Sequence, residues 1–482
     1  HRSDTPPTMS SSQFYNKGVD ESVVSRQEIE EFTKRNEFFL KPSSRKYAKQ
    51  YFSMYQYRLK NLRDRVHKTA MEKWGHGTKK INGNTIEKQD KILDIASGKL
   101  CWVIGTVFCD AKYKLDILND VEKGTDDVLP LEPVTYVNED EQPIVMLEDE
   151  SGRAILNNDN FLAKNLLVTG CIVAVLGIEI QSGIFEIMDI AYPDCAPQKP
   201  LPLGENKRGK IALVSGLNIG DVGHYDLKLE FLKQYLLGEL GNAEDKLDGS
   251  LISQLIIAGD SIMPIQNLRA EMDLKNFVTT NNYGSKNISK YNVESFKKLD
   301  EFLTDILVSL PVAVMPGKND PAEICLPQQP LHRSLFKNNS SLLDGNRLTR
   351  LTNPQWIDAQ TVKILGTSGQ NVDDIQKYIV PKKDHQFTSI EIMENNIKWQ
   401  NFVPTAPDTL YCYPYENYDP FIFSDDLPHV YFVGNQQQFD SKLFEHDGVN
   451  VRLISIPKFK ESGQFVLLDL DTLETEVVTI EI

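Results

Sequence analysis

The stretch that decides the fold class is Pro311–Phe336, PVAVMPGKNDPAEICLPQQPLHRSLF. Its apolar run Val312–Met315 predicts a buried strand. A Pro-Gly turn signal ends the run, and the polar residues Lys318–Asp320 follow at once. Buried strands that end in glycine and then in polar groups are how α/β enzymes place chemistry at the carboxyl end of a sheet. We therefore compare the other strand ends with this one.

The composition is that of an ordinary soluble globular protein. Of the 482 residues, 40% are hydrophobic and 25% are charged, and the chain is long enough for two or three domains. No apolar run approaches the roughly 18–20 residues of a membrane helix, so we expect no membrane contact. The six cysteines are scattered without a CxxC pair, which favours reduced thiols in a cytosolic or nuclear protein over a zinc site or a disulfide framework.

The sequence predicts α/β plus β architecture in five segments. The short strands after residue 91 fit an OB barrel, and the later alternation of strands and helices fits a layered α/β domain. We expect residues 1–8, ahead of Met9, to be a remnant of expression. The segments are an N-terminal extension with a short helix near Arg26–Arg35 (1–40), a helical segment (41–90), the barrel (91–195), a proline-rich linker (196–209) and the α/β domain (210–482).

Several individual elements can be predicted from hydrophobic periodicity and turn residues. Helices are predicted at Tyr47–Lys68, Tyr225–Leu237 and Val293–Leu310. The predicted strands are Lys99–Cys109, Ile144–Glu148, Arg153–Leu156, Leu167–Gly177, Gly183–Ile190, Lys210–Ser215, Gln254–Ala258, Val312–Met315, Val430–Val433, Val451–Ile456 and Gln464–Leu468, the last two joined by a connection that ends in the turn Lys460–Gly463.

Two charged regions bear on nucleic-acid binding. The net charge of −16 makes the chain a poor candidate for gripping DNA over its whole surface, because affinity for phosphate comes from Lys and Arg. The segment Lys41–Arg65 is basic, and it can be a nucleic-acid patch or the solvated face of a helix docked on the core, which the tyrosines on its apolar stripe favour. The predicted barrel hairpin is acidic at Glu139–Glu141 and Glu148–Glu150, which favours protein binding over single-strand binding.

Four strand ends, taken together, resemble those of the calcineurin-like metallophosphoesterases. They are Leu213–Leu217, Ile257–Asp260, Met315–Asp320 and Phe432–Gln436. That superfamily ends its strands with Asp-x-His, Gly-Asp, Gly-Asn-His-Asp and Gly-His-x-His, because two metal ions need carboxylate, imidazole and amide ligands. The resemblance implies the same layered scaffold here.

The ligands of such a dinuclear site are largely replaced in this sequence. Asp260 and Asp320 keep their carboxylates, and we expect them to cap loop amides. An ammonium at position 318 would oppose a dication in the same place. The degenerate positions are Ser215, Leu217, Asp260, Lys318, Asn319, Asp320, Asn435 and Gln437. We therefore expect neither a metal nor another cofactor on this chain, no catalytic residues, and ordinary roles for His224, His332, His385, His429 and His446.

An OB barrel followed by a degenerate phosphoesterase resembles the B-subunits of replicative DNA polymerases and, among these, the small-subunit family of the eukaryotic delta polymerase, in its fungal form. The run LPQQPLH is the most specific, and GTSGQN and PTAPDTL follow it in order. The stretches that carry the resemblance are Tyr55–Leu59, Leu213–Gly216, Ala258–Asp260, Met315–Pro321, Leu326–Phe336, Thr352–Pro354, Gly366–Asn371, Pro404–Leu410 and His429–Asn435.

The resemblance implies a nuclear, non-catalytic scaffold for DNA replication and repair. Such a subunit holds the cysteine-rich C-terminal domain of the catalytic subunit, in which an iron–sulfur cluster is expected, and a third subunit that binds the sliding clamp. The resemblance implies that this chain contacts the sliding clamp only indirectly and has little direct contact with DNA. It also implies that the chain binds the catalytic subunit of polymerase zeta in translesion synthesis. It also implies that segment 41–90 packs on the phosphoesterase-like domain.

Two other readings stay open at this point. An active metal-dependent phosphodiesterase or exonuclease would require histidines at the positions of Leu217, Asn319 and Asn435, which the sequence lacks. A single-strand-binding barrel would require salt-sensitive DNA binding by the isolated chain.

Overall fold

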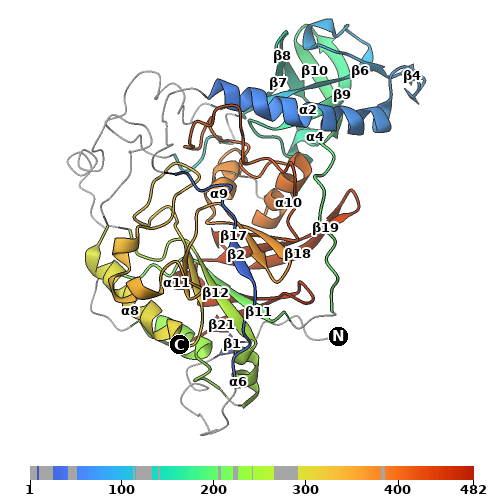
Figure 1. The fold of residues 1–482 in the computed structure, drawn as a ribbon. Helices are drawn as coiled ribbons and strands as arrows, with labels where there is room; N and C mark the ends of the chain where they lie inside the picture. The colour runs from blue at the N-terminus through green and yellow to red at the C-terminus, as the bar shows by residue number, and fades with distance from the viewer. Residues whose placement is uncertain are drawn as a thin grey trace, which may run out of the picture.

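The computed structural model describes residues 8–9, 25–41, 51–111, 114, 133–138, 142–204, 208–220, 226–241, 243–264, 291–381 and 386–482. Within these residues, a small barrel stands at one end of a larger α/β body, and the long helix α2 (Phe52–Trp74) lies between them (Figure 1). The segment that follows the barrel runs along the side of the body before the first central strand begins.

The α/β body is built on two mixed sheets, as far as the structure describes the chain. The first sheet has the order β1 (Thr8–Met9), β21 (Thr475–Ile480), β20 (Gln464–Asp469), β11 (Lys210–Val214), β12 (Ile252–Ala258), β13 (Val312–Met315) and β14 (Leu348–Arg350). The second has the order β18 (Asp440–His446), β19 (Val449–Pro457), β17 (Val430–Gln436), β16 (Val362–Thr367), β15 (Gln355–Ala359) and β2 (Phe32–Lys34).

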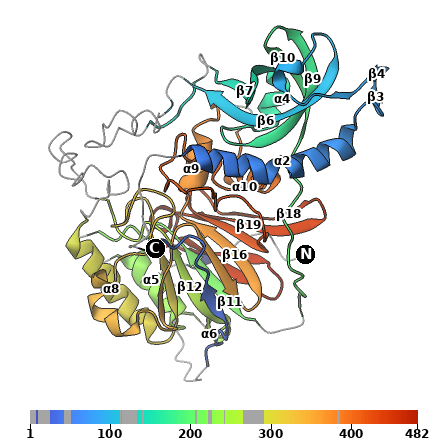
Figure 2. The same ribbon diagram turned by 45° about the horizontal axis from the view of Figure 1, so that its top comes forward.

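The central strands bury both faces, which explains their continuous apolar sequences. In β11, Ile211 and Leu213 pack between the two sheets, while Ala212 and Val214 pack under helices on the outer face. The outer face of the first sheet is covered by α5 (Leu227–Leu236) and α8 (Val293–Leu307). The outer face of the second is covered by α9 (Gln370–Gln376) and α10 (Ser389–Trp399), on the side that faces α2 (Figure 2).

The barrel strands are β6 (Leu100–Asp110), β7 (Ile144–Asp149), β8 (Gly152–Asn157), β10 (Ile184–Ala191) and β9 (Ile172–Gln181) in spatial order, and β9 pairs back onto β6. This closed order, with α4 (Asp159–Lys164) between β8 and β9, is that of an OB fold. Shorter elements complete the chain: β3 (Lys80–Ile81), β4 (Asn84–Thr85), β5 (Glu87–Lys88), η2 (Ile92–Asp94), α6 (Ala243–Ser250), η4 (Arg333–Leu335), η5 (Lys337–Leu342) and α11 (Phe459–Ser462).

Helix α2 packs on both parts of the molecule. Met54, in its first half, joins an apolar core to which both the body and the barrel contribute, and Leu62, Val66 and Trp74 join a second core made mainly with barrel residues. The segment 41–90 therefore contacts the barrel as well as the α/β body. In the described residues the helix begins at Phe52, after its N-cap residue Tyr51, and continues to Trp74, six residues beyond the predicted end. Residues 47–50 of the predicted helix lie outside the described residues.

Three predictions of local structure were wrong. No helix forms at Arg26–Arg35, because Phe32–Lys34 pairs with β15 and satisfies the open edge of the second sheet. The strand predicted from Leu167 begins only at Ile172, after a turn at Gly170 with φ +95°. The predicted turn at Lys460–Gly463 is mostly the short helix α11, which Gly463 ends in a left-handed conformation.

The other predicted elements lie within a few residues of the observed ones, and β13 matches at both ends. Sequence periodicity missed β15, β16, β18, β21, α9 and α10. A signal for α10 was present: Thr388 and Glu391 form a capping box, in which each side chain accepts a hydrogen bond from the other residue's backbone N–H.

Candidate functional site

The carboxyl ends of β11, β12 and β13 meet those of β16 and β17 where the two sheets face each other. The strand ends pack so closely that their glycine positions have no room for a side chain. A Cβ on Gly259 would collide with the Oγ of Ser368 and lie 3.0 Å from the Cα of Gly317. A Cβ on Gly434 would lie 2.5 Å from the carbonyl oxygen of Ala258, across the gap between the sheets. The glycines therefore let the strand ends close directly on one another.

Asp320 uses its carboxylate to hold the loop that follows β12. The side chain is buried, and it accepts hydrogen bonds from the backbone N–H groups of Gly317, Asp260, Ser261 and Ile262 at 2.8–3.3 Å. Four amide donors occupy the lone pairs of one carboxylate. These bonds give Asp320 the amide-capping role that the sequence predicted for it.

Asp260 lies beside Asp320 in a left-handed backbone conformation, with φ +55°. Its Oδ1 accepts a hydrogen bond from the backbone N–H of Asn319 at 2.9 Å. Burial raises the pKa of Asp260, although the ammonium groups of Lys458 and Lys318 act in the opposite direction. Burial and the neighbouring charge of Asp260 raise the pKa of Asp320 to about 7.

Asn435 links the ends of strands from both sheets. Its backbone N–H donates to the Oγ of Ser215 at 2.8 Å, and its side-chain amide donates to the carbonyl oxygens of Ser368 at 2.8 Å and Ala258 at 3.2 Å. The hydroxyl of Ser215 in turn donates to the carbonyl oxygen of Pro457 at 3.1 Å. These hydrogen bonds connect the ends of the two sheets.

The structure brings Ser215, Asp260, Asn319, Asp320 and Asn435 together and leaves the other predicted site residues outside these contacts. Leu217 is buried in the apolar core under α5 and α8, and the side chains of Lys318 and Gln437 are exposed. The ammonium of Lys318 still acts on Asp260 electrostatically.

Two side chains in this cluster were missed by the sequence argument. Gln436, rather than Gln437, points inward, where it accepts a hydrogen bond from Ser389 at 2.7 Å and donates to Asp373 at 3.2 Å. Ser368 receives the amide of Asn435. The motif GTSGQN contains Ser368 but gives no signal for its role. Which of the two adjacent glutamines points inward depends on the register of the strand.

Two of the described histidines, His332 and His429, serve local structure. His332 caps η4 by accepting from the backbone N–H of Ser334 at 3.1 Å. The Nδ1 of His429 accepts from the N–H of Lys363 at 2.8 Å, and its Nε2 lies 2.7 Å from the carbonyl oxygen of Lys199, which assigns the proton to Nε2. Burial lowers the pKa of His429. His224 and His385 lie outside the described residues.

Arg58 was grouped with the basic face of the helix, and the structure corrects this. Its side chain is 1% exposed, and its Nε donates to the fully buried Asp419 at 2.7 Å. The other guanidinium nitrogens donate to the carbonyl oxygens of Pro404 and Ala406 at 3.0 and 2.8 Å. Arg58 therefore ties α2 to the α/β body through hydrogen bonds from all three of its guanidinium nitrogens.

Arg65 is also bound inside the molecule. It donates to the carbonyl oxygens of Asp194 and Phe423, both at 2.6 Å, and to the Oε1 of Gln400 at 2.7 Å. Two members of the basic segment are thus unavailable to nucleic acid, as the docked-helix alternative requires. The basic residues at 45, 46 and 49 lie outside the described residues.

Some of the acidic side chains on the barrel hairpin form hydrogen bonds and an ion pair with nearby residues. Asp149 accepts hydrogen bonds from the backbone N–H groups of Ile92 and Ser151 at 2.8 Å, and Glu148 forms an ion pair with Arg153 at 2.8 Å. Residues 139–141 lie outside the described residues.

Comparison with known proteins identifies the family. A family profile for the B-type subunits of DNA polymerases alpha and epsilon matches residues 211–441, and one described as DNA polymerase delta subunit OB-fold domain matches residues 50–190. Over 477 residues, the chain is 39% identical to the DNA polymerase delta small subunit of Saccharomyces cerevisiae, a match that covers 94% of this chain and 93% of that protein. The chain belongs to the DNA polymerase delta small subunit family.

Plant and animal members of the family are similar along most of the chain. The small subunit of Arabidopsis thaliana is 36% identical over 81% of this chain and 84% of its own. The DNA polymerase delta subunit 2 of Drosophila melanogaster is 32% identical over 90% of this chain and 94% of its own. These matches confirm the family that the sequence motifs predicted. They also confirm that the chain is an accessory subunit of a replicative polymerase and that it contains an OB-fold domain.

Among solved structures, an archaeal phosphodiesterase is similar with a TM-score of 0.26 and 11% identity, covering 56% of this chain and 98% of that one. A likeness this weak carries no argument about the site. In the described part of the chain, no helix has both the length and the apolar character that crossing a membrane requires.

Proposed function

We propose that this chain is a non-catalytic scaffold subunit of DNA polymerase delta. It joins the cysteine-rich C-terminal domain of the catalytic subunit to a third subunit that binds the sliding clamp, in DNA replication and repair. The observation that carries the proposal is the 39% identity, over 94% of the chain, to a protein named as a DNA polymerase delta small subunit.

The strand ends support a role without phosphoesterase chemistry. Two divalent cations would need free carboxylate, imidazole and amide ligands. Asp320 gives its lone pairs to four backbone N–H groups, Leu217 is an apolar core residue, and Lys318 brings an ammonium near Asp260. The residues at the strand ends therefore do not fit a calcineurin-like dinuclear metal site.

The remaining parts of the proposal concern the assembly. The chain holds no cofactor at its strand ends, and the iron–sulfur cluster belongs to the catalytic subunit. The sliding clamp is contacted through the third subunit, and the catalytic subunit of polymerase zeta is a second client in translesion synthesis. The complex works in the nucleus.

The charge of the chain supports protein contacts over DNA contacts. Its net charge is −16, and both Arg58 and Arg65 are occupied by internal hydrogen bonds. An acidic scaffold can associate with a polymerase whose DNA-binding surfaces are basic without competing for the template phosphates.

Three measurements on the full chain test the partner and the chemistry. The full chain is purified, its metal content is measured, and its hydrolysis of bis-p-nitrophenyl phosphate is followed with added Mn²⁺. A pull-down then tests binding to the cysteine-rich C-terminal domain of a delta-polymerase catalytic subunit. We expect no turnover and stable capture of that domain.

Two outcomes would overturn this view. Turnover that Asp260→Ala abolishes would make the chain an active phosphodiesterase, which is the alternative function. The scaffold proposal would be refuted if the chain failed to capture the catalytic subunit's domain although circular dichroism showed that the chain was folded.

A further inference from the structure

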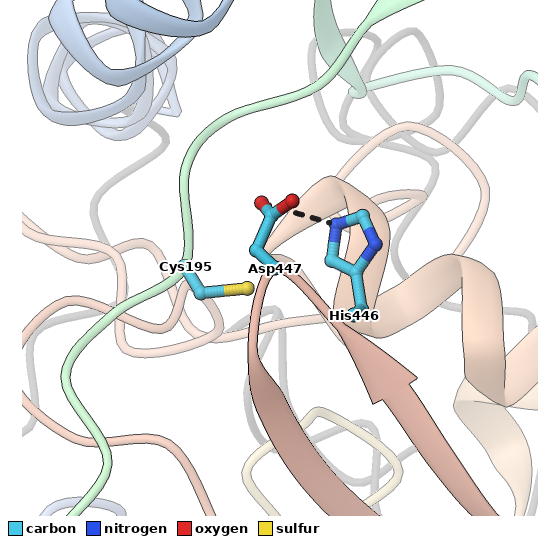
Figure 3. A group of neighbouring side chains, drawn as sticks. All are labelled: Cys195, His446 and Asp447. Atoms are coloured by element: carbon cyan, nitrogen blue, oxygen red, sulfur yellow. Dashed lines mark ion pairs between the residues drawn. The ribbon is translucent and has the colours of Figure 1, made fainter.

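Three side chains of metal-ligating types meet at a place far from the strand ends. Cys195 lies on the segment that leaves the barrel, His446 is the last residue of β18, and Asp447 begins the turn into β19 (Figure 3). One sulfur, one imidazole nitrogen and one carboxylate oxygen from these residues all lie within 4.8 Å of one another.

All three residues are at least partly exposed, which a ligand site needs. Cys195 is the one cysteine among the six that is not buried, and all six are free thiols. In the described part of the chain, the buried Nε2 of His446 has no hydrogen-bond partner and lies 3.5 Å from the Oδ2 of Asp447. Asp447 is exposed at the tip of the hairpin, so solvent reaches the group from that side.

The side chain of Gln400 holds the thiol of Cys195 in position. The Nε2 of Gln400 donates to the Sγ of Cys195 at 3.5 Å. The Oε1 of Gln400 accepts from Arg65 at 2.7 Å and from the backbone N–H of Ala196 at 2.8 Å. Side chains that orient ligands in this way are a regular part of protein metal sites.

We propose that Cys195, His446 and Asp447 bind one Zn²⁺ ion and thereby clip the segment between barrel and body to the β18–β19 hairpin. Sulfur, nitrogen and carboxylate oxygen are the donors that Zn²⁺ takes, at about 2.0–2.3 Å, and a solvent molecule completes four-coordination. The thiolate is the form of cysteine that binds the ion, so binding displaces the proton of the Cys195 thiol.

The proposal differs from the exclusion of zinc that the cysteine spacing favoured. That exclusion rested on the lack of a CxxC pair, but these ligands come from segments that are distant in the sequence and are joined only by the fold. Because the ion would bind the folded chain and not the unfolded one, it would stabilise the fold as its concentration rises above the dissociation constant.

Metal binding to the full chain tests the proposal. The chain is stripped with a chelator and titrated with Zn²⁺ in competition with a chromophoric chelator, and with Co²⁺ to detect thiolate charge-transfer absorption. We expect one ion per chain, and an affinity reduced by at least roughly 10–100-fold in Cys195→Ser and in His446→Gln. His76→Gln is the matched control, because His76 also lies beside a carboxylate, that of Glu87 at 3.3 Å, and it should leave binding unchanged.

A readout on the unaltered chain guards against variants that misfold. Zn²⁺ should slow the alkylation of Cys195, measured by peptide mass spectrometry, by at least tenfold relative to the metal-free chain. The proposal is overturned if Zn²⁺ leaves that rate unchanged, if Co²⁺ binds without thiolate absorption, or if Cys195→Ser and His446→Gln bind as tightly as the parent chain.

Discussion

Replacing Arg58 with methionine removes the cation of the buried ion pair that ties α2 to the α/β body. The side chain of Arg58 is 1% exposed and that of Asp419 is fully buried, so nothing from solvent can replace the guanidinium. Removal of one member leaves a buried carboxylate without its counter-charge, and the carbonyl oxygens of Pro404 and Ala406 lose their donors. Breaking a buried pair in this way costs about 3–5 kcal/mol.

The assay is urea unfolding of the full chain, followed by tryptophan fluorescence and circular dichroism. We expect Arg58→Met to lower the free energy of unfolding by that amount and to expose the junction around α2 to limited proteolysis. The matched control is Arg153→Met, because Arg153 forms an ion pair of similar length, 2.8 Å, but its side chain is 62% exposed. That change should cost less than about 1 kcal/mol.

A double variant checks the electrostatic reasoning. Arg58→Met combined with Asp419→Leu leaves no buried charge, so it should cost less than the sum of the two single changes. The reasoning would be refuted if Arg58→Met cost no more than Arg153→Met, or if the double variant cost the full sum.

Three further predictions concern the strand ends and His429, all measured by urea unfolding. Gly259→Ala should destabilise by about 1–3 kcal/mol more than Gly183→Ala, since both glycines have positive φ but only the first lacks space for a Cβ. Asp260→Asn should stabilise the chain more at about pH 8 than at about pH 4, because burial raises the pKa of both Asp260 and Asp320, the latter to about 7, so ionising the buried pair costs stability as the pH rises from about 4 to about 7. The lowered pKa of His429 makes the parent chain lose stability as the pH falls below about 6.5, and His429→Gln should weaken that dependence.

Each of these predictions has an outcome that contradicts it. Equal losses in Gly259→Ala and Gly183→Ala would mean that the strand ends can open to admit a side chain. An Asp260→Asn variant that is less stable at high pH than at low pH, relative to the parent chain, would reverse the sign of the charge argument. An unchanged acid dependence in His429→Gln would assign that dependence to other groups.

The sequence predicted the central strands well because their signal is local. Val312–Met315 is apolar throughout and is closed by Pro-Gly, so its length and its ends can be read without a partner. The same local reading failed at Phe32–Lys34, where the backbone becomes a strand only because β15 offers an open edge. It also missed β15 and β16, whose sequences QWIDA and VKILGT have neither a continuous apolar run nor a Pro-Gly stop.

The candidate site shows the same division. Residue types at the strand ends were enough to predict which side chains follow the strands and that Asp320 caps amides. They could not show that Gln436 rather than Gln437 points inward, because a shift of one residue in register reverses the two faces.

By itself, then, the sequence determined the two-part architecture, the family and the polar residues at the strand ends, since these depend on patterns within single segments. Only the tertiary structure decided that Arg58 is an internal tie, and only the tertiary structure brought Cys195 to His446 and Asp447. Both depend on contacts between segments that are distant in the chain, and the partner of a side chain in such a contact is chosen by packing, which no local pattern encodes.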